Sequence, residues 1–450
     1  MTPLWTSDEI ARATGGTASE PFAVTGVSFD SREAEAGHLF VAMKGETMDG
    51  HRFVPGAFAS GASAALVSQP VDGPHVMVVD AGAALNAMAV AARARTSGKI
   101  IGVTGSVGKT GTKEALFAAL DRDAPGRAHR SVKSYNNHTG VPLSLARMPA
   151  DTAFGVFEMG MNHAGELAEL TRIVRPHAAI VTAIAPAHRE FFDSVEAIAD
   201  AKGEIFQGLQ PGGTAIIPFD SPYRDRLRAA AEPYAARILT FGRGEGADVH
   251  AREAMATGGG GTLICAVLPD AELTFTLAPP GDHWVSNAMA VLAAVYAVGG
   301  DLPAAGLALA EMPGLPGRGE RVTIRVEGGE ATLIDESYNA NPASMAATIA
   351  SLGREPGRRV AILGEMRELG AESASYHADL APILRENGVE TLFLVGPAML
   401  SLASELPFAQ HFPAVEALIP HVRPAPRDTV LVKGSNGVGL ARLVAALKAA

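Results

Sequence analysis

Residues 100–120 combine the side chains and the spacing that bind a chain of phosphate groups. An apolar run at 100–103 stops at a loop, and a helical apolar pattern follows that loop. Glycines let backbone N–H groups turn toward phosphate oxygens, and the start of the helix adds partial positive charge. We expect Lys109 to reach the outer phosphates and Thr110 to offer its hydroxyl to Mg²⁺. The loop reads Thr104, Gly105, Ser106, Val107, Gly108, Lys109 and Thr110.

This phosphate loop (residues 104–110) is shorter than the usual pattern, whose first glycine falls here at Val103. What remains is Gly-x-x-Gly-Lys-Thr. An ordinary glycine turn between a strand and a helix is the alternative interpretation. Such a turn has no need of a Lys-Thr pair at the start of the helix, so we favour phosphate binding.

Glu158 is the second candidate for metal chemistry. It follows the apolar run 154–157, which reads as a buried strand. A carboxylate at the carboxyl end of such a strand, near a phosphate loop, lies where enzymes of this type hold Mg²⁺. The alternative is a glutamate that ends its strand in solvent.

Lys202 occupies a position where the helical pattern calls for an apolar residue. The pattern runs through Val195, Ile198, Ile205 and Leu209, at spacings that place all of them on one face with Lys202. The lysine stem could lie on the core while the ammonium reaches solvent. A buried lysine with a chemical role is the other interpretation, and the pattern alone does not choose between them.

Several polar loops are candidate substrate contacts. The cluster 30–32 contains Ser31 and Arg32, and the cluster 44–51 begins with Lys44; both could bind a diphosphate, or be solvated turns. Asn136 and Asn137 lie in a polar loop before a short helix. Residues 433–439 form a second glycine loop, which is either a binding site for another anion or a tight turn.

Composition limits the class of protein. At 450 residues, with 47% hydrophobic and 19% charged residues, the chain should fold into about three globular domains. Its net charge of −11 argues against nucleic acid as a partner, and its single cysteine excludes an internal disulfide. The sequence shows neither a secretory signal nor an apolar run of ~20 residues, so we expect a cytoplasmic, monomeric protein without membrane insertion.

Apolar runs alternate with helical patterns along the whole chain, which predicts an α/β fold in three domains. We expect a small N-terminal α/β domain at 1–90 and a central domain at 91–312 with a P-loop-type parallel sheet. A Rossmann-like α/β domain should follow at 313–450. The Gly/Pro-rich stretch 313–319 would be the hinge, and 247–280 should form a β-hairpin with its tip at 258–261. Asn341 should cap a helix that starts at Pro342.

These loops together resemble those of the Mur ligases of bacterial cell-wall synthesis, over essentially the whole chain. The stretches that carry the resemblance are DSR (30–32), KGETMDGH (44–51), TGSVGKT (104–110), NNHTGVPLSL (136–145), EMGMNHAGE (158–166), APAHREFF (185–192), AKGEIF (201–206), GRGER (317–321), IDESYNANPASM (334–345), LGEMRELG (363–370) and VKGSNGVG (432–439). The stretches YNANP (338–342) and LGEMRELG (363–370) resemble those of the members that add D-alanyl-D-alanine to UDP-N-acetylmuramoyl-tripeptide.

The resemblance implies an ATP-dependent amide-bond ligase that works through an acyl phosphate. It implies that Thr110 and Glu158 hold one Mg²⁺, and that His188 holds a second with Lys202, which family members often carry as a CO₂-derived carbamate. Asn287, Arg318 and Asp335 would contact ATP. Asn136 and Asn137 would contact the muramoyl-tripeptide, Ser31, Arg32 and Lys44 the UDP group, and Tyr338 and Asn339 the dipeptide. At Trp284 many members carry asparagine, so the adenine contact stays open.

Two other functions fit the same residues less well. A ligase similar to folylpolyglutamate synthase shares the short phosphate loop, but it has no reason to carry the clusters at 30–32 and 44–51. A silent nucleotide and UDP-sugar binding protein on the same fold would not need Lys109, Glu158 and Lys202 together. The peptide's third residue, lysine or meso-diaminopimelate, is not determined by these patterns.

Overall fold

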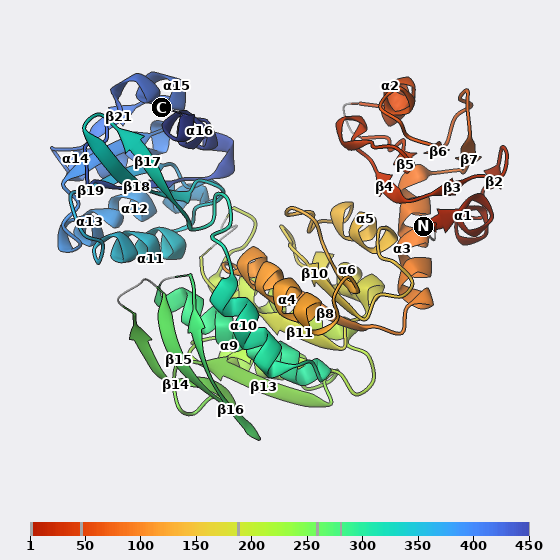
Figure 1. The fold of residues 1–450 in the computed structure, drawn as a ribbon, viewed down its shortest axis with the longest axis horizontal. Coiled ribbons are helices and arrows are strands. Elements are labelled where there is room, and N and C mark those ends of the chain that lie inside the picture. The colour runs from red at the N-terminus through yellow and green to blue at the C-terminus, as the bar shows by residue number, and fades with distance from the viewer. Residues whose placement is uncertain (1–2, 46–47, 187–189, 258–260, 280, 450) are drawn as a thin grey trace.

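The computed structural model describes residues 3–45, 48–186, 190–257, 261–279 and 281–449. The chain forms three α/β units, each around its own main sheet (Figure 1). The central unit lies at the bottom of that view, the first unit at the upper right and the third unit at the upper left. The predicted α/β class with a central parallel sheet is therefore confirmed.

The first unit is built on a five-stranded sheet in the order β2-β7-β6-β5-β4. The apolar run 23–27 is divided between β3, which pairs with β1, and β4, which pairs with β5. Thr25 lies between β3 and β4, where the chain passes from one sheet to the other, and its N–H donates to Gly37 O at 2.8 Å. The elements are β1 Trp5–Thr6, β2 Thr17–Ala18, β3 Ala23–Val24, β4 Gly26–Ser28, β5 His38–Val41, β6 Ala64–Val67, β7 His75–Met77, α1 Ser7–Thr14, α2 Val54–Ala59 and α3 Ala81–Arg95.

The central sheet has nine strands in the order β16-β15-β14-β13-β12-β11-β8-β10-β9. In this spatial order, all neighbouring strands between β9 and β14 pair parallel. Strands β14, β15 and β16 pair antiparallel and extend the sheet, as the β-hairpin prediction for 247–280 requires. Residues 258–260 of the predicted tip at 258–261 lie outside the described residues. The strands are β8 Lys99–Thr104, β9 Ala128–Arg130, β10 Phe154–Glu158, β11 Ala178–Val181, β12 Thr214–Pro218, β13 Arg237–Gly242, β14 Val249–Ala256, β15 Thr262–Leu268 and β16 Ala271–Leu277.

Helices cover both faces of the central sheet. Helix α9 is apolar almost all round, as expected of a helix packed inside a core, and its residues share one cluster with those of α4 and the sheet. The helices are α4 Lys109–Asp123, α5 Gly140–Ala146, α6 Glu166–Val174, α7 Val195–Gly203, α8 Arg224–Ala231, α9 Asp282–Val298 and α10 Leu302–Glu311. Because β8 lies between β11 and β10, its carboxyl end and the start of α4 have a parallel strand on either side.

The prediction of one α-helix over 195–209 is wrong for the second half of that range. Helix α7 ends at Gly203, and residues Glu204–Gly208 form a tighter 3₁₀ turn. The Thr171 hydroxyl donates to Ile205 O at 2.6 Å, and a Cβ at Gly208 would lie 2.2 Å from Thr171 O. The 3₁₀ segment therefore packs closely against α6, and this contact requires glycine at position 208.

The third unit has a six-stranded sheet in the order β17-β18-β22-β19-β20-β21, parallel except for β17. Asn341 caps α11 and forms a capping box with Ser344, so the predicted start of this helix is confirmed. The edge strands β17 and β21 were not predicted. The elements are β17 Glu320–Val326, β18 Gly329–Glu336, β19 Arg359–Gly364, β20 Thr391–Val395, β21 Gln410–Phe412, β22 Thr429–Lys433, α11 Pro342–Leu352, α12 Ser373–Ala378, α13 Leu380–Glu386, α14 Leu400–Glu405, α15 Val415–Leu418 and α16 Ala441–Ala449.

The first unit packs against α5 of the central unit. The Trp5 indole donates to Ala146 O at 2.8 Å, and Leu143 and Ala146 belong to the core of the first unit. Helix α3 stands between the two units in Figure 1 and spans residue 90, where a domain boundary was predicted. The division at 90 and 312 stays a prediction.

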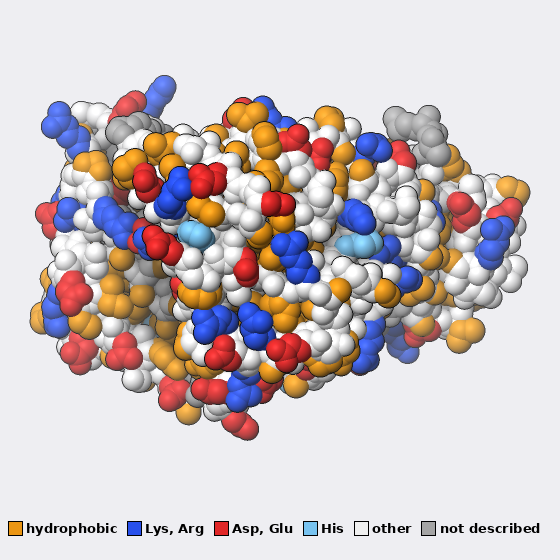
Figure 2. Space-filling view, turned by 90° about the horizontal axis from the view of Figure 1, so that it is seen from below, with side chains coloured by type: hydrophobic (Ala, Val, Ile, Leu, Met, Phe, Trp, Pro, Cys, Tyr) orange, Lys and Arg blue, Asp and Glu red, His pale blue; other side chains and the backbone are white. Residues whose placement is uncertain are grey.

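The outer surface carries charges of both signs. On the face seen from below in Figure 2, basic and acidic side chains are interspersed, and no broad single-sign patch is visible there. Within the described residues, no helix combines the length and apolar character needed to cross a membrane.

Candidate active site

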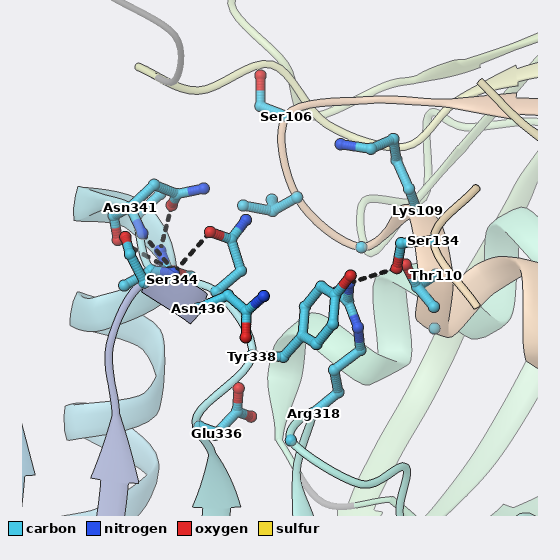
Figure 3. Close-up of a pocket in the computed structure, with 18 of the residues that line it drawn as sticks. Ser106, Lys109, Thr110, Ser134, Arg318, Glu336, Tyr338, Asn341, Ser344 and Asn436 are labelled. Carbon is cyan, nitrogen blue, oxygen red and sulfur yellow. Dashed lines mark hydrogen bonds between the residues drawn. The ribbon is translucent and has the colours of Figure 1, made fainter. Parts of the chain in front are cut away.

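A cavity of about 600 Å³ lies between the central and third units. Its central side is formed by the start of α4, the end of β10 and the start of α9, and its other side by α11 and the loops after β18, β19 and β22. Figure 3 shows Lys109 and Ser106 facing Asn341, Ser344 and Asn436, with Arg318 and Tyr338 between the two groups. The structure therefore gathers side chains from distant parts of the sequence around one space.

Two glycines give the phosphate loop its shape. Gly105 and Gly108 have φ angles of +149° and +83°, which a residue with a side chain rarely adopts. A Cβ at Gly105 would lie 1.9 Å from the Thr182 hydroxyl, and one at Gly108 would lie 2.8 Å from Asn287 Oδ1. These close approaches bring Thr182 and Asn287 against the loop and explain both glycines.

The start of α4 is a cradle for an anion. Gly108 is the N-cap of the helix and provides no side-chain hydrogen bond. The first backbone hydrogen bond of the helix is donated by Thr112 N to Gly108 O. The amides ahead of Thr112 are thus the ones a phosphate can accept from. Ser106 contributes less than expected, because its N–H donates to Ala183 O and its hydroxyl to Ala185 O.

Lys109 lies across this cradle. Its Nζ donates to Gly105 O at 2.6 Å, so the side chain folds back over the loop. Burial lowers the pKa of Lys109, the Glu158 carboxylate raises that pKa, and the charge of Arg318 lowers it. A phosphate group would offer Lys109 an anionic partner in place of a neutral carbonyl.

Glu158 ends β10 and is almost fully buried. Its Oε2 accepts a hydrogen bond of 2.9 Å from Thr110 Oγ1, and its Oε1 accepts one of 2.8 Å from Asn136 Nδ2. Octahedral Mg²⁺ with bonds of ~2.1 Å holds neighbouring ligands about 3 Å apart, and carboxylate and hydroxyl oxygens are ligands it prefers. The separation of Thr110 and Glu158 therefore fits one magnesium ion.

Lys202 is 1% exposed, so its ammonium does not reach solvent and the surface interpretation is wrong. Burial, together with the positive charge of Lys109, lowers its pKa well below that of an ordinary lysine. The predicted partner His188 lies outside the described residues. Within the described part of the chain, no group of three or more His, Cys, Asp or Glu side chains is arranged to hold a metal.

Arg318 joins the third unit to the central unit across the cavity. Its guanidinium lies 4.1 Å from the ring centroid of Tyr338, and its Nη2 donates to Ser134 Oγ at 3.3 Å (Figure 3). Asn339, next to Tyr338, also lines the cavity. The predicted nucleotide and dipeptide residues of this region are thus neighbours.

Asp335 lies behind the cavity wall and Glu336 in it. Both Asp335 oxygens are occupied by backbone and hydroxyl donors of Gly317 and Ser337. Glu336 lines the cavity, and its carboxylate lies 3.4 Å from Lys433 Nζ. Burial lowers the pKa of Lys433, and Glu336 raises it. A direct nucleotide contact of Asp335 stays a prediction.

Many predicted site residues line one cavity, and others do not. Those that do are Ser106, Val107, Gly108, Lys109, Thr110, Asn136, Glu158, Asn287, Arg318, Tyr338 and Asn339. The described residues outside the lining are Thr104, Gly105, Asn137, Lys202, Asp335, Ser31, Arg32 and Lys44. Asn137 instead accepts backbone N–H groups of Thr139 and Gly140, which stabilises the turn before α5. Its role toward a substrate stays a prediction.

The predicted diphosphate contacts lie in the first unit. The Arg32 side chain is 87% exposed and pairs with Asp30, a hydrogen bond that lowers the pKa of Asp30 to about 2. Ser31 begins a short 3₁₀ helix after β4, and Lys44 lies in the loop after β5, so both are at the carboxyl edge of the same sheet. An exposed guanidinium whose partner is a neighbouring carboxylate is free to exchange that partner for a ligand.

Sequence reasoning gave no role to several residues of the cavity wall. Ser134, Glu336 and Arg367 carry no signal of their own, although all three lie in or beside loops with polar runs. For the second glycine loop, the sequence pattern does not choose between an anion site and a tight turn. Its Lys433, Ser435, Asn436 and Gly437 line the same cavity as the phosphate loop.

Trp284 is a packed wall residue. It is 7% exposed, and a Cβ at Gly111 of α4 would lie 2.9 Å from its ring. His283 and Asn287, from the same first turns of α9, also line the cavity. The start of α9 therefore forms one wall beside the phosphate loop.

Comparison with known proteins places the whole chain in one family. Residues 23–97 match the Mur ligase family catalytic domain, 103–295 the Mur ligase middle domain and 317–436 the Mur ligase glutamate ligase domain. The chain is 34% identical to UDP-N-acetylmuramoyl-tripeptide--D-alanyl-D-alanine ligase of Escherichia coli, over 94% of this chain and 93% of that protein.

Solved structures give the same result. A crystal structure of MurF from Acinetobacter baumannii matches with a TM-score of 0.86 at 30% identity, covering 99% of both chains. MurF ligase from Thermotoga maritima in complex with ADP matches with a TM-score of 0.79 at 27% identity, over 95% of this chain and 97% of that one. Sequence, domain order and fold agree, and the chain belongs to the Mur ligase family.

Proposed function

We propose that this chain joins D-alanyl-D-alanine to UDP-N-acetylmuramoyl-tripeptide with consumption of ATP. The observation that carries the proposal is the arrangement of Lys109, Thr110 and Glu158 around one cavity that the third unit completes. Full-length relatives that bear this activity in their names support it. The reaction would build a peptidoglycan precursor in the cytoplasm, on a monomeric enzyme.

The chemistry has two steps. A carboxylate oxygen of the tripeptide attacks the γ-phosphorus of ATP, and ADP leaves with the electrons of the broken P–O bond. The amine of D-alanyl-D-alanine then attacks the carbonyl carbon of the acyl phosphate. Phosphate leaves, one proton is released from the amine, and an amide bond remains.

Lys109 and the amides at the start of α4 would hold the phosphates of ATP. The Lys109 ammonium, already at the mouth of the loop, would balance charge on the phosphoryl group in transfer. Thr110 and Glu158 would hold Mg²⁺, which supplies charge stabilisation to the phosphates when bound. Asn136 would keep the Glu158 carboxylate in orientation through Oε1.

Lys202 would carry the CO₂-derived carbamate and, with His188, hold a second Mg²⁺. The depressed pKa of Lys202 supports this, because only a neutral amine reacts with CO₂. The carbamate is an anion with two oxygens, the type of ligand that Mg²⁺ prefers. A cation in turn offsets the cost of burying that anion.

The remaining predicted contacts divide among the units. Asn287 and Arg318 would contact ATP directly. Asp335 would act indirectly, because its carboxylate accepts the Gly317 N–H and so holds the turn before Arg318. In the first unit, Ser31, Arg32 and Lys44 would bind the UDP group. The muramoyl-tripeptide would meet Asn136 and Asn137, and the dipeptide would meet Tyr338 and Asn339 of the third unit.

Two tests separate this proposal from the alternatives. Phosphate release should require UDP-N-acetylmuramoyl-tripeptide and D-alanyl-D-alanine together, with the pentapeptide product detected by mass. Release with a folate and glutamate instead would favour a folylpolyglutamate-type ligase, and nucleotide binding without any turnover would favour a silent relative. Positional isotope exchange in ATP that needs the tripeptide but not the dipeptide would support the acyl phosphate.

A further inference from the structure

Lys113 is a fully buried cation that the proposed reaction leaves without a role. It lies on α4 one turn after Lys109, with 0% of its surface exposed. Its Nζ donates to Lys133 O at 2.7 Å and lies 2.9 Å from Glu114 Oε1 and 3.9 Å from Glu158 Oε2. Burying an ammonium group is costly unless it is paired, so these contacts fix Lys113 in one position.

The carbonyl that Lys113 holds belongs to a strained residue. Lys133 has a φ of +52°, in the left-handed region that a residue with a side chain rarely occupies. Its own ammonium pairs with Glu33 of the first unit, and the Tyr135 hydroxyl donates to the same carboxylate at 3.1 Å. Lys133 is thus held on both sides, by Lys113 from within and by Glu33 from outside.

The loop 131–137 that contains Lys133 reaches the candidate site. Asn136 Nδ2 donates to Glu158 Oε1 at 2.8 Å, and Asn136 O accepts from Gly160 N at 2.7 Å. Ser134 accepts from Arg318 of the third unit. This one loop therefore contacts the first unit, the carboxylate of the central unit and the third unit.

We propose that Lys113 is a positioning residue of the ligase, which holds loop 131–137 so that Asn136 orients the Glu158 carboxylate. The inference rests on the proposed function, in which Glu158 holds Mg²⁺. With Oε1 engaged by Asn136, Oε2 stays directed at Thr110. Without the Lys113 ammonium, Lys133 can relax to an ordinary backbone conformation, and the Asn136 side chain moves with it.

The test is a double-mutant cycle on kcat. Lys113→Met keeps an unbranched side chain only one atom shorter and removes the charge, and Asn136→Ala removes the contact with Glu158. We expect each to lower kcat at least tenfold, and Lys113→Met to keep KM for ATP within threefold of wild type, since Lys113 does not line the cavity. Because both act through one contact, the double variant should fall no more than about threefold below the lower single variant.

Arg93→Met is a matched control for loss of a buried cation. Arg93 is 5% exposed and donates to Val174 O and Arg175 O at 2.8 Å, away from the cavity. It should lower the unfolding midpoint with little change in kcat. If Lys113→Met keeps kcat within twofold of wild type, or if its effect multiplies with that of Asn136→Ala, the positioning role is wrong.

Glu33→Gln covers the case in which Lys113→Met does not fold. It removes the outer anchor of Lys133 without touching the core, and it should lower kcat and show the same non-additivity with Asn136→Ala. If the fold-losses in kcat of Glu33→Gln and Asn136→Ala multiply fully in the double variant, the proposal is overturned. Wild-type protein that fails to form the pentapeptide would instead overturn the proposed function, so the two failures are distinguishable.

Discussion

Lys109 and Lys202 are two lysines of the central unit, and the positive charge of Lys109 lowers the pKa of Lys202. Both are drawn out of water, which lowers the pKa of each. Lys109 gains compensation from Glu158, whose charge raises its pKa. Lys109 therefore has a carboxylate neighbour that offsets part of its burial, whereas the charged neighbour of Lys202 adds to the effect of burial.

Lys202 should lose its function when it cannot form a carbamate. Lys202→Ala should fold normally and lose most turnover. Wild-type turnover should fall in CO₂-depleted buffer and recover when bicarbonate is added, because the neutral amine exchanges CO₂ with solution. Initial rates of phosphate release measure both effects.

Lys202→Arg is the control for charge and length. It is positive and long, but it cannot be carbamylated, so it should be as inactive as the alanine variant. An arginine variant with substantial turnover would show that only a buried cation is needed at this position.

Lys109→Ala should leave the fold intact and lower turnover by about 10²–10³, the usual effect of losing one electrostatic stabiliser. Among the described residues, the hydrogen-bond acceptor of the Lys109 side chain is a loop carbonyl, so loss of this side chain should cost little stability. Circular dichroism and kcat give the two readings. Near-normal turnover in a folded variant would remove Lys109 from the mechanism.

Gly111→Ala should destabilise the protein, although alanine is the better helix former. The new Cβ would lie 2.9 Å from the Trp284 ring, and overpacking of this kind costs about 1–3 kcal/mol. Gly56→Ala in α2 is the matched control, because nothing lies within 4 Å of its Cβ position, and it should gain about 0.5–1 kcal/mol. Equal shifts in the free energy of unfolding for the two variants would contradict the wall assigned to Trp284.

The free energy of unfolding should fall as the pH falls from about 6.5 to about 4. Burial, together with the charge of Arg93, lowers the pKa of His177 to about 4, and burial lowers that of His129 to about 4. Between these values and the ordinary pKa of histidine, the unfolded chain binds more protons than the folded one. Acidification therefore favours unfolding in this window.

The variant His177→Asn tests whether His177 contributes to this loss of stability at low pH. His177 Nδ1 accepts a hydrogen bond from Ile100 N at 2.9 Å, and the asparagine oxygen can accept in its place without titrating. Denaturant unfolding at pH 7 and pH 5 should show a smaller loss of stability for this variant. An unchanged loss would mean that His177 does not titrate as stated.

Binding of ATP together with the muramoyl-tripeptide should draw the third unit further onto the central one. The cavity walls come from both units, and residues 313–319 connect them without a helix or strand. Ligands that touch both walls favour the closed arrangement. Small-angle scattering should give a smaller radius of gyration with both ligands, and an identical value would contradict closure.

The sequence by itself determined the features that depend on neighbouring residues. The glycines and Lys-Thr pair of residues 104–110 predicted a helix start at Lys109, and Asn341 with Pro342 predicted the start of α11. The apolar positions around Lys202 required a choice between snorkelling and burial, and only packing decided for burial. Capping, periodicity and turn chemistry act over a few residues, so they can be read directly from the chain.

The tertiary structure decided which polar residues meet. Asp335 and Glu336 are adjacent on β18, and because successive side chains point to opposite faces, one lies behind the wall and the other in the cavity. No local pattern states which of the two side chains faces the cavity. The turn of Asn136 toward Glu158 and the reach of Arg318 to Ser134 depend on how sheets and units pack together. Such contacts join residues far apart in sequence, and only the folded chain brings them within hydrogen-bond distance.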